Sequence, residues 1–126
     1  MLPEPNRLHH HLDFSRTVRR GRRAGRSDIV VHACVRSADG EPQLVYGGPR
    51  FGLIVSKAVG SAVVRHRVSR QLRHACRPLV RSLSGDVDVV IRALPSAAGG
   101  SVDEFERQLT SCLVKLRLLD VSLGRS

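Results

Sequence analysis

The chain has 126 residues, of which 41% are hydrophobic, and this size predicts a single domain over residues 1–126 with flexible ends at 1–5 and 121–126. Its core must be aliphatic, because there are three Phe, one Tyr and no Trp. The net charge of +10 predicts a polyanionic partner such as nucleic acid. No segment resembles a transmembrane helix or a signal peptide, so we expect a cytoplasmic protein without a membrane partner.

The N-terminal part of the chain predicts a short helix over residues 11–20. Either Leu12 or Phe14, together with Val18, is expected to face inward, and Gly21 is expected to end the helix.

A basic segment over residues 19–26 follows, and its two glycines predict a flexible loop. We interpret its arginines as a second phosphate-contact patch, although a disordered linker is the alternative. The histidines at 9–11 cannot all face one metal ion on a helix, so polar surface is the better interpretation. The arginines of the segment are Arg19, Arg20, Arg22, Arg23 and Arg26.

Three strands are expected next, over residues 28–36, 44–46 and 51–56. Residues 37–42 predict a hairpin turn with Asp39-Gly40 at its tip. Tight turns between consecutive strands predict an antiparallel meander.

Residues 61–77 predict an amphipathic helix with one apolar face, one basic face and Arg65 at their border. Pro78 predicts a kink or an early stop. No acidic residue lies between Glu41 and Asp86, so i,i+4 ion pairs cannot balance the basic face. A polyanion partner explains this face better than an ordinary solvated surface does. The apolar face comprises Val64, Val68, Leu72, Ala75, Cys76 and Leu79, and the basic face comprises His66, Arg67, Arg70, Arg73, His74, Arg77 and Arg81.

The C-terminal part predicts a fourth strand over 86–94 and, after a loop, a last helix that runs to about Leu119. Ser101 and Glu104 have the spacing of a capping box at the start of this helix. Its expected inward residues are Val102, Phe105, Leu109, Cys112, Leu113 and Leu116.

The predicted order is α-β-β-β-α-β-α, an α+β sandwich in which helices cover a four-stranded sheet. The strand at 51–56, the helix at 61–77 and the strand at 87–94 form a βαβ unit, which favours a parallel strand pair.

No catalytic constellation is evident in the sequence. Asp86 and Asp88 share a strand face, but they lie at the start of the strand, where solvated charges are common. Cys34, Cys76 and Cys112 each fall on an apolar face, so we interpret them as reduced core residues rather than as a disulfide or metal site. Any catalysis is therefore expected to come from a partner.

The central motif resembles the signature of the bacterial ribonuclease P protein subunit. It reads FGLIVSK at 51–57, VGSAVVRHR at 59–67 and RQLR at 70–73. The resemblance extends to Asn6-Arg7-Leu8, Asp13-Phe14 and Gly21. Departures from the family pattern occur at Val18, His32, Ala58, Ser61, His66 and Ser69.

The resemblance implies an α+β fold shared with a ribosomal protein domain, with a left-handed βαβ crossover. It also implies an RNA-binding subunit whose partners are ribonuclease P RNA and precursor tRNA, not DNA. The RNA would hold Mg²⁺ and hydrolyse the phosphodiester that joins the 5′ leader to the tRNA, and no protein residue would be catalytic or bind metal.

The family's sites can be placed on this chain. The expected contacts to the catalytic RNA are Lys57, Arg65, His66, Arg67, Arg70, Arg73 and Arg77. The expected leader cleft comprises Phe14, Val18 and His32, and the further basic contacts are Arg7, Arg19, Arg20, Arg22 and Arg23.

Two alternatives remain open from the sequence. A structural rRNA-binding protein of the ribosome would have the same composition, and only the motif at 50–73 separates the two readings. A protein-only nuclease would need a carboxylate cluster that binds metal, and the scattered acids argue against it.

Overall fold

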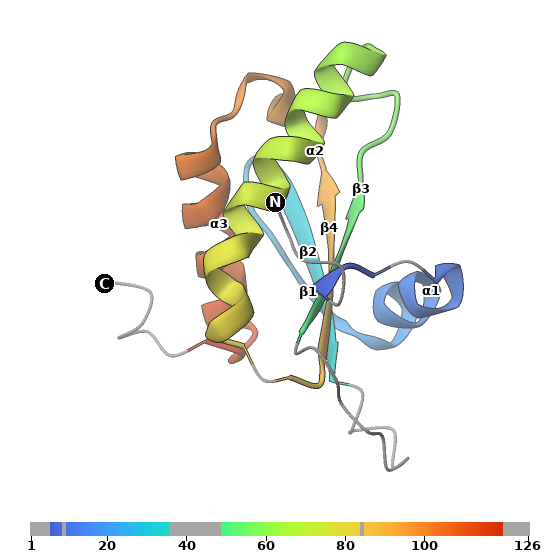
Figure 1. The fold of residues 1–126 in the computed structure, drawn as a ribbon, viewed down its shortest axis with the longest axis vertical. Coiled ribbons are helices and arrows are strands. Elements are labelled where there is room, and N and C mark those ends of the chain that lie inside the picture. Colours follow the sequence, from blue (N-terminus) through green and yellow to red (C-terminus); the bar gives the residue numbers. More distant parts are fainter. Residues whose placement is uncertain (1–5, 9, 36–48, 84, 120–126) are drawn as a thin grey trace.

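The structure is a computed structural model that describes residues 6–8, 10–35, 49–83 and 85–119. Their order, α-β-β-β-α-β-α, confirms the prediction (Figure 1). Two short 3-10 helices, η3 and η4, follow α2 and β4. The elements are α1 (His11–Arg20), β1 (Arg22–Gly25), β2 (Ile29–Val35), β3 (Arg50–Ile54), α2 (Ala62–Cys76), η3 (Arg77–Arg81), β4 (Val87–Ala93), η4 (Pro95–Gly99) and α3 (Val102–Lys115).

The four strands form one mixed sheet in the order β1-β2-β4-β3. β3 and β4 are parallel, as the βαβ unit predicts, whereas β1–β2 and β2–β4 are antiparallel. The expected meander is wrong for β2, because its two neighbours in the sheet are β1 and β4. The hairpin turn at 37–42 and the strand at 44–46 lie outside the described residues, and the handedness of the crossover stays a prediction.

The basic segment after α1 is a strand rather than the expected loop. Arg22–Gly25 pairs with β2, and Ala24 is buried in the core between exposed neighbours. Gly21 allows this pairing, because a Cβ there would overlap the carbonyl oxygens of Thr17 and Ala33. Local propensity pointed to a loop, but pairing with β2 overrides it.

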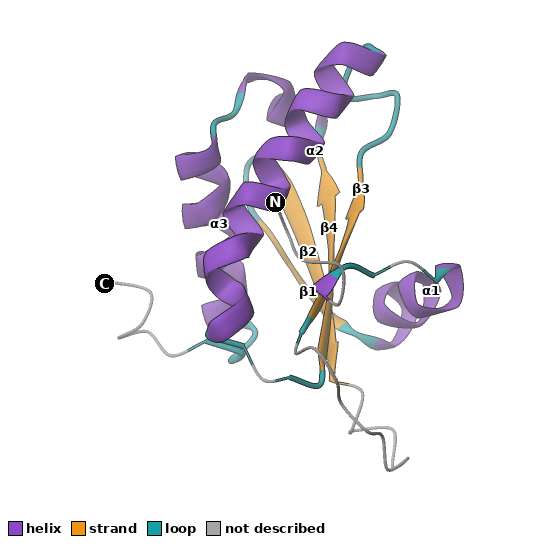
Figure 2. Cartoon of the chain, in the orientation of Figure 1, coloured by secondary structure: helices purple, strands orange, loops and turns teal. Residues whose placement is uncertain are grey.

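The helices cover the two faces of the sheet unequally. α2 and α3 lie side by side on one face, and α1 lies alone on the other (Figure 2). Alternate residues of β2 and β4, including Val31, Val89 and Ile91, are fully buried under α2 and α3. Thus the aliphatic core fills one side, and the α1 side is free to carry polar groups.

α2 matches its prediction closely. The Ser61 hydroxyl accepts a hydrogen bond from the Val64 amide at 3.4 Å and caps its N-terminus. Its buried residues are those of the predicted apolar face, and it ends at Cys76, where η3 begins with Pro78 in its first turn. All three cysteines are buried and outside any disulfide, as expected.

α3 begins as predicted but ends earlier. The Ser101 hydroxyl accepts a hydrogen bond from the Glu104 amide at 3.2 Å, which confirms Ser101 as the N-cap, and it donates to the Glu104 carboxylate at 3.1 Å. The helix stops at Lys115 rather than near Leu119, because Arg117 adopts a left-handed backbone with φ of 62°. Val102 is only half-buried.

α1 has the predicted bounds, and its inner face includes the expected Phe14 and Val18, both half-buried, together with Thr17, which was not expected. Leu12, one of the two candidate inward residues, is 61% exposed, whereas Thr17 is fully buried. The Thr17 hydroxyl donates to the Asp13 carbonyl at 2.8 Å, so burial leaves no polar atom unsatisfied. α1 therefore packs on the sheet through a small polar residue. Among the described helices, none combines the length and apolar character needed to cross a membrane.

Candidate nucleic-acid interface

The basic face of α2 is displayed to solvent. His66, Arg67, Arg70 and Arg77 are exposed, as is Lys57 in the turn before the helix, and Arg65 and Arg73 are half-buried. Within the described residues, no ion pair involves an arginine of α2. The guanidinium groups of this face therefore keep their charge available for a polyanion.

One arginine of this face is held by the protein itself. Arg67 donates a hydrogen bond to the carbonyl of Ala98 in η4. This contact orients its guanidinium group, so Arg67 is partly structural as well as a candidate RNA contact.

In the second basic cluster, at residues 19–26, some arginines are exposed and others hold protein segments together. Arg19, Arg20 and Arg23 are exposed. Arg22 donates to the Leu116 carbonyl, and Arg26 donates to the Ser111 hydroxyl at 2.9 Å, so both link the β1 edge to α3. The sequence reading of this cluster as one phosphate-contact patch missed this structural use.

A shallow hollow of about 210 Å³ lies between α1 and β3. Phe14, Ser15, Val18 and Arg19 line it from α1, and Ile54 lines it from β3. It brings together Phe14 and Val18, two of the three expected leader-cleft residues. An aromatic ring beside an arginine suits a stacked base and its phosphate.

His32, the third expected cleft residue, does not line this hollow. It lies on β2, opposite Arg23 of β1 and Val90 of β4. Its imidazole is 5% exposed, and neither ring nitrogen has a hydrogen-bond partner among the described residues. Burial, and then the charges of Arg92 and Arg23, lower its pKa below the ordinary value of 6.5.

The lowered pKa of His32 predicts acid-sensitive folding. The His32 imidazole of the unfolded chain binds a proton near the ordinary pKa of 6.5, whereas the buried imidazole of the folded chain binds one only at lower pH. The contribution of neutral His32 to the free energy of unfolding is therefore complete above pH 6.5 and is lost as the pH falls through the folded pKa. We expect the melting temperature of wild type to fall more than that of His32→Phe between about pH 8 and pH 5. Parallel curves for the two proteins would contradict this prediction.

A partly buried ion-pair network, centred on the buried Asp88, fixes α1 to the sheet. Arg50 of β3 holds Asp88 of β4 with two hydrogen bonds, Nε to Oδ1 and Nη2 to Oδ2, both 2.8 Å long. Arg16 of α1 contacts the same Oδ2 at 3.4 Å. Asp13 of α1 binds Arg16 at 3.0 Å and Arg50 at 3.4 Å. The hydrogen bond with Asp88 is the main cause of a raised Arg50 pKa, against the opposing effect of desolvation.

The expectation that Asp88 is a solvated charge at a strand start is wrong, since its side chain is fully buried. The parallel register places it directly opposite Arg50, which supplies the opposite charge. The sequence does show Asp88 as a carboxylate within an otherwise mostly apolar strand. Its partner Arg50 could not be identified without the register between β3 and β4.

A protein-held metal ion would need several His, Cys, Asp or Glu side chains close together among the described residues. The described residues contain no group of three or more His, Cys, Asp or Glu that could hold an ion. Near the cleft, Asp13 and Asp88 are engaged by arginines, which compete with any cation. These residues do not fit a protein-held metal.

Comparisons with known proteins place this chain in a protein family. A family model described as Ribonuclease P matches residues 2–117. Relatives named ribonuclease P protein component include one from Nocardia farcinica, 59% identical over 92% of this chain and 83% of the relative. Another, from Rhodococcus opacus, is 60% identical over 94% of each chain.

Solved structures share the fold. The RNase P protein of Staphylococcus aureus has a TM-score of 0.75 at 21% identity, over 91% of this chain and 98% of that one. The RNase P protein of Thermotoga maritima, solved in complex with 1-(4-fluorophenyl)-2-thiourea, has a TM-score of 0.67 at 18% identity, over 90% of this chain and 100% of that one.

Proposed function

Because the chain belongs to the ribonuclease P protein family, we propose that it is the RNA-binding subunit that assists a catalytic RNA in removing the 5′ leader from precursor tRNA. The observation that carries the proposal is the exposed row of arginines on α2, which no described acid neutralises. A ribosomal role is not favoured, because the family match covers nearly the whole chain.

The α2 face would bind the phosphates of the catalytic RNA. Arg70 of α2 and Arg77 at the start of η3 are exposed, while Leu72 and Cys76 anchor α2 in the core. A rigid helix holds the arginine backbones at fixed spacing, so little backbone order has to be gained on binding. Lys57, Arg65, His66, Arg67 and Arg73 complete this proposed surface.

The α1 side of the sheet would receive the leader. Phe14 and Val18 offer an apolar surface for a base, while Arg19 and, on the sheet, Arg23 offer positive charge. His32 lies on the same face, but its ring nitrogens are buried, so a leader base would reach them only after the neighbouring side chains move. Arg7, Arg20 and Arg22 would add electrostatic attraction.

The hydrolysis itself would be carried out by the RNA with Mg²⁺. Since the described protein residues do not fit a metal site, the protein contributes binding and orientation. Its positive charge also offsets the repulsion between two RNA molecules, which lowers the Mg²⁺ concentration that their association requires.

The test is reconstitution with the cognate RNA at low Mg²⁺. We expect the protein to restore cleavage of a tRNA precursor that the RNA alone cleaves poorly, and we expect no cleavage by the protein alone. Arg70→Gln with Arg77→Gln should weaken RNA affinity and flatten its salt dependence by about one unit of slope per lost phosphate contact. Arg107→Gln on the exposed side of α3 is the matched control.

Two results would contradict the proposal. Cleavage by the protein alone that survives ribonuclease treatment would indicate a protein-only nuclease. An unchanged affinity and salt slope in a folded double variant would mean that the α2 arginines are only a solvated face.

A further inference from the structure

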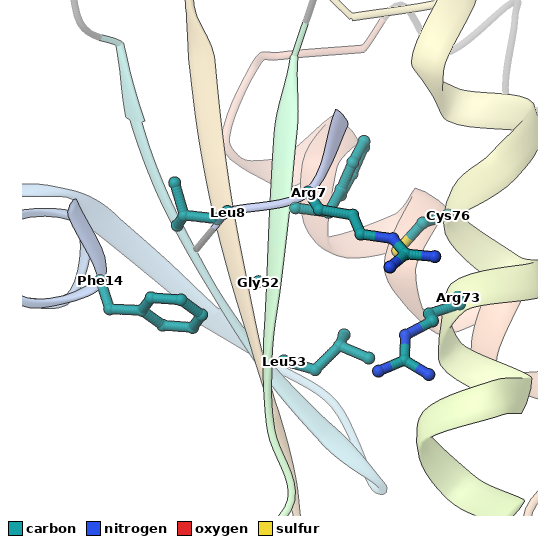
Figure 3. A pocket seen from close by; sticks show the side chains of 8 residues that line it. Arg7, Leu8, Phe14, Gly52, Leu53, Arg73 and Cys76 are labelled. Carbon is teal, nitrogen blue, oxygen red and sulfur yellow. The ribbon is translucent and has the colours of Figure 1, made fainter. Parts of the chain in front are cut away.

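Two rows of residues cross the sheet on its α1 side. In β3, Gly52 and Ile54 face this side, whereas Leu53 between them points toward α2 (Figure 3). The strand registers extend each of the two positions across the neighbouring strands. The inner row is Gly52, Val90, His32 and Arg23, and the outer row is Ile54, Arg92, Val30 and Gly25.

The two rows differ in how much of them α1 covers. In the inner row, Val90 is fully buried and His32 is 5% exposed. In the outer row, Ile54 and Val30 are only half-buried, and Arg92 between them is exposed. The outer row is therefore a strip of sheet surface that stays open to solvent beside α1.

This strip runs along the side of α1. The first turns of the helix lie at β3, where the Phe14 ring approaches Gly52, and the helix ends at β2, where Gly21 lies against the Ala33 carbonyl. α1 therefore crosses the strands from β3 toward β2, and the outer row crosses them in the same direction. A chain lying beside α1 would follow the outer row.

The hollow beside Val18 lies at one end of this strip. Ile54 lines the hollow from the sheet and is the direct neighbour of Arg92 in the parallel register. Because adjacent strands lie about 4.8 Å apart, the Arg92 backbone is one strand away from the hollow. An extended nucleic-acid strand with one base in the hollow can thus place an adjoining phosphate over Arg92.

Arg92 lies where positive charge is not compensated. An arginine in a sheet is stabilised by an opposite charge on a neighbouring strand, but the cross-strand neighbours of Arg92 are Val30 and Ile54. Within the described part of the chain, no ion pair involves Arg92. After burial, the charges of Arg92 and Arg23 are the causes that lower the pKa of His32, so both arginines contribute to the positive potential of this face.

This combination suits a single strand of nucleic acid. The guanidinium fork of Arg92 matches the oxygens of a phosphate. The half-buried side chains of Val30 and Ile54 offer apolar surface to the sugars and bases on either side. An ordinary solvated face would instead intersperse acidic residues with its arginines. The strip therefore has the charge and the apolar surface of a single-strand binding track.

We propose that the 5′ leader continues from the hollow along the outer row and that Arg92 binds one of its phosphates. The inference rests on the proposed function and deepens it, because it extends the leader site from α1 to the internal strand β4. It also makes affinity depend on leader length, since a leader too short to pass the hollow gains nothing from Arg92.

The affinity of the reconstituted complex for precursor tRNA tests this proposal, with leaders of increasing length and with mature tRNA. Arg92→Gln should weaken the binding of long-leader precursor about tenfold and leave the binding of mature tRNA unchanged. The salt slope should fall by about 0.7, the value for one phosphate of a single strand. Arg107→Gln, which removes an exposed arginine of α3 on the other face of the sheet, is the matched control.

Uncharged linkages in the leader locate the contact. Each leader of a series carries one methylphosphonate linkage in place of a phosphate, at successive positions. At the position that Arg92 contacts, Arg92→Gln should cost less than about twofold, because the charge that the arginine binds is already absent. At the other positions, the full loss caused by Arg92→Gln should remain.

Several outcomes would overturn the leader contact alone. An equal loss with mature tRNA, or with the catalytic RNA by itself, would mean that Arg92 binds a phosphate outside the leader. A loss no larger than that of Arg107→Gln would mean that Arg92 is only solvated. Losses that are independent at every linkage position would mean that no single leader phosphate is bound. If wild type itself neither stimulates cleavage nor distinguishes precursor from mature tRNA, the proposed function fails as well.

Circular dichroism and thermal melting check the folding of each variant. Arg92→Lys keeps the positive charge on β4 but removes the guanidinium fork. It should retain the salt slope of wild type and bind long-leader precursor with an affinity between those of wild type and Arg92→Gln. If Arg92→Lys instead shows the same weak affinity and reduced slope as Arg92→Gln, the losses come from a disturbed sheet, which contradicts the phosphate contact.

Discussion

Replacing Asp88 with Ala should lower the free energy of unfolding by about 2–3 kcal/mol. Removing one partner of a fully buried ion pair costs about 3–5 kcal/mol, because the other charge is left uncompensated. Here the remaining Arg50 and Arg16 side chains are 27% and 25% exposed, so water compensates part of the loss. Urea unfolding monitored by circular dichroism measures the effect.

Asp13→Ala is the matched control, because Asp13 belongs to the same network but is 24% exposed. Its loss should cost about 0.5–1 kcal/mol. Equal effects of the two substitutions would mean that burial of Asp88 does not set the strength of the network. We also expect Asp88→Ala to weaken the binding of leader-bearing precursor, since the network holds α1 on the sheet.

Gly52→Ala should displace the Phe14 ring and lower the free energy of unfolding by about 1–3 kcal/mol. A Cβ at position 52 would overlap the Phe14 ring and lie 3.2 Å from the Leu8 Cβ. If Phe14 stacks a leader base, its displacement should also weaken leader-dependent binding by about 1–3 kcal/mol. Melting temperature and affinity for precursor with and without a leader measure the two effects.

Phe14→Ala tests whether the cost of Gly52→Ala comes from overlap with the Phe14 ring. In the Phe14→Ala background, Gly52→Ala should cost less than 1 kcal/mol, because the overlapping ring is gone. Leader-dependent binding should stay weak in this double variant. Gly99→Ala is the control for adding a methyl group to a glycine, since nothing lies within 4 Å of its Cβ position. An equal cost in both backgrounds would contradict the proposed overlap.

Local patterns predicted the helices well, because a helix brings together residues only a few positions apart. The period of α2 identified both its buried and its basic face, and Ser61 and Ser101 marked two helix starts. The βαβ unit followed from element order alone. These features depend on short stretches of chain that a sequence displays directly.

The sheet partners could not be predicted in the same way. The strand at Arg22–Gly25 contains two arginines and one glycine, so only its pairing with β2 makes it a strand. The Arg50–Asp88 pair requires the parallel register, and the orphaned ring nitrogens of His32 require knowledge of every neighbouring group. Each depends on residues distant in sequence, whose approach only the folded chain shows.

The strand order also determines when the sheet can form during synthesis on the ribosome. β4 lies between β2 and β3, pairing Ile29 with Ala93 and Phe51 with Val89. β4 is also the last of the described strands along the chain, so until it emerges β2 and β3 have no central partner. β1 and β2 can form their hairpin early, but the sheet cannot close until α2 and β4 have left the exit tunnel. During that interval the nascent chain already carries its arginine-rich helix beside ribosomal RNA.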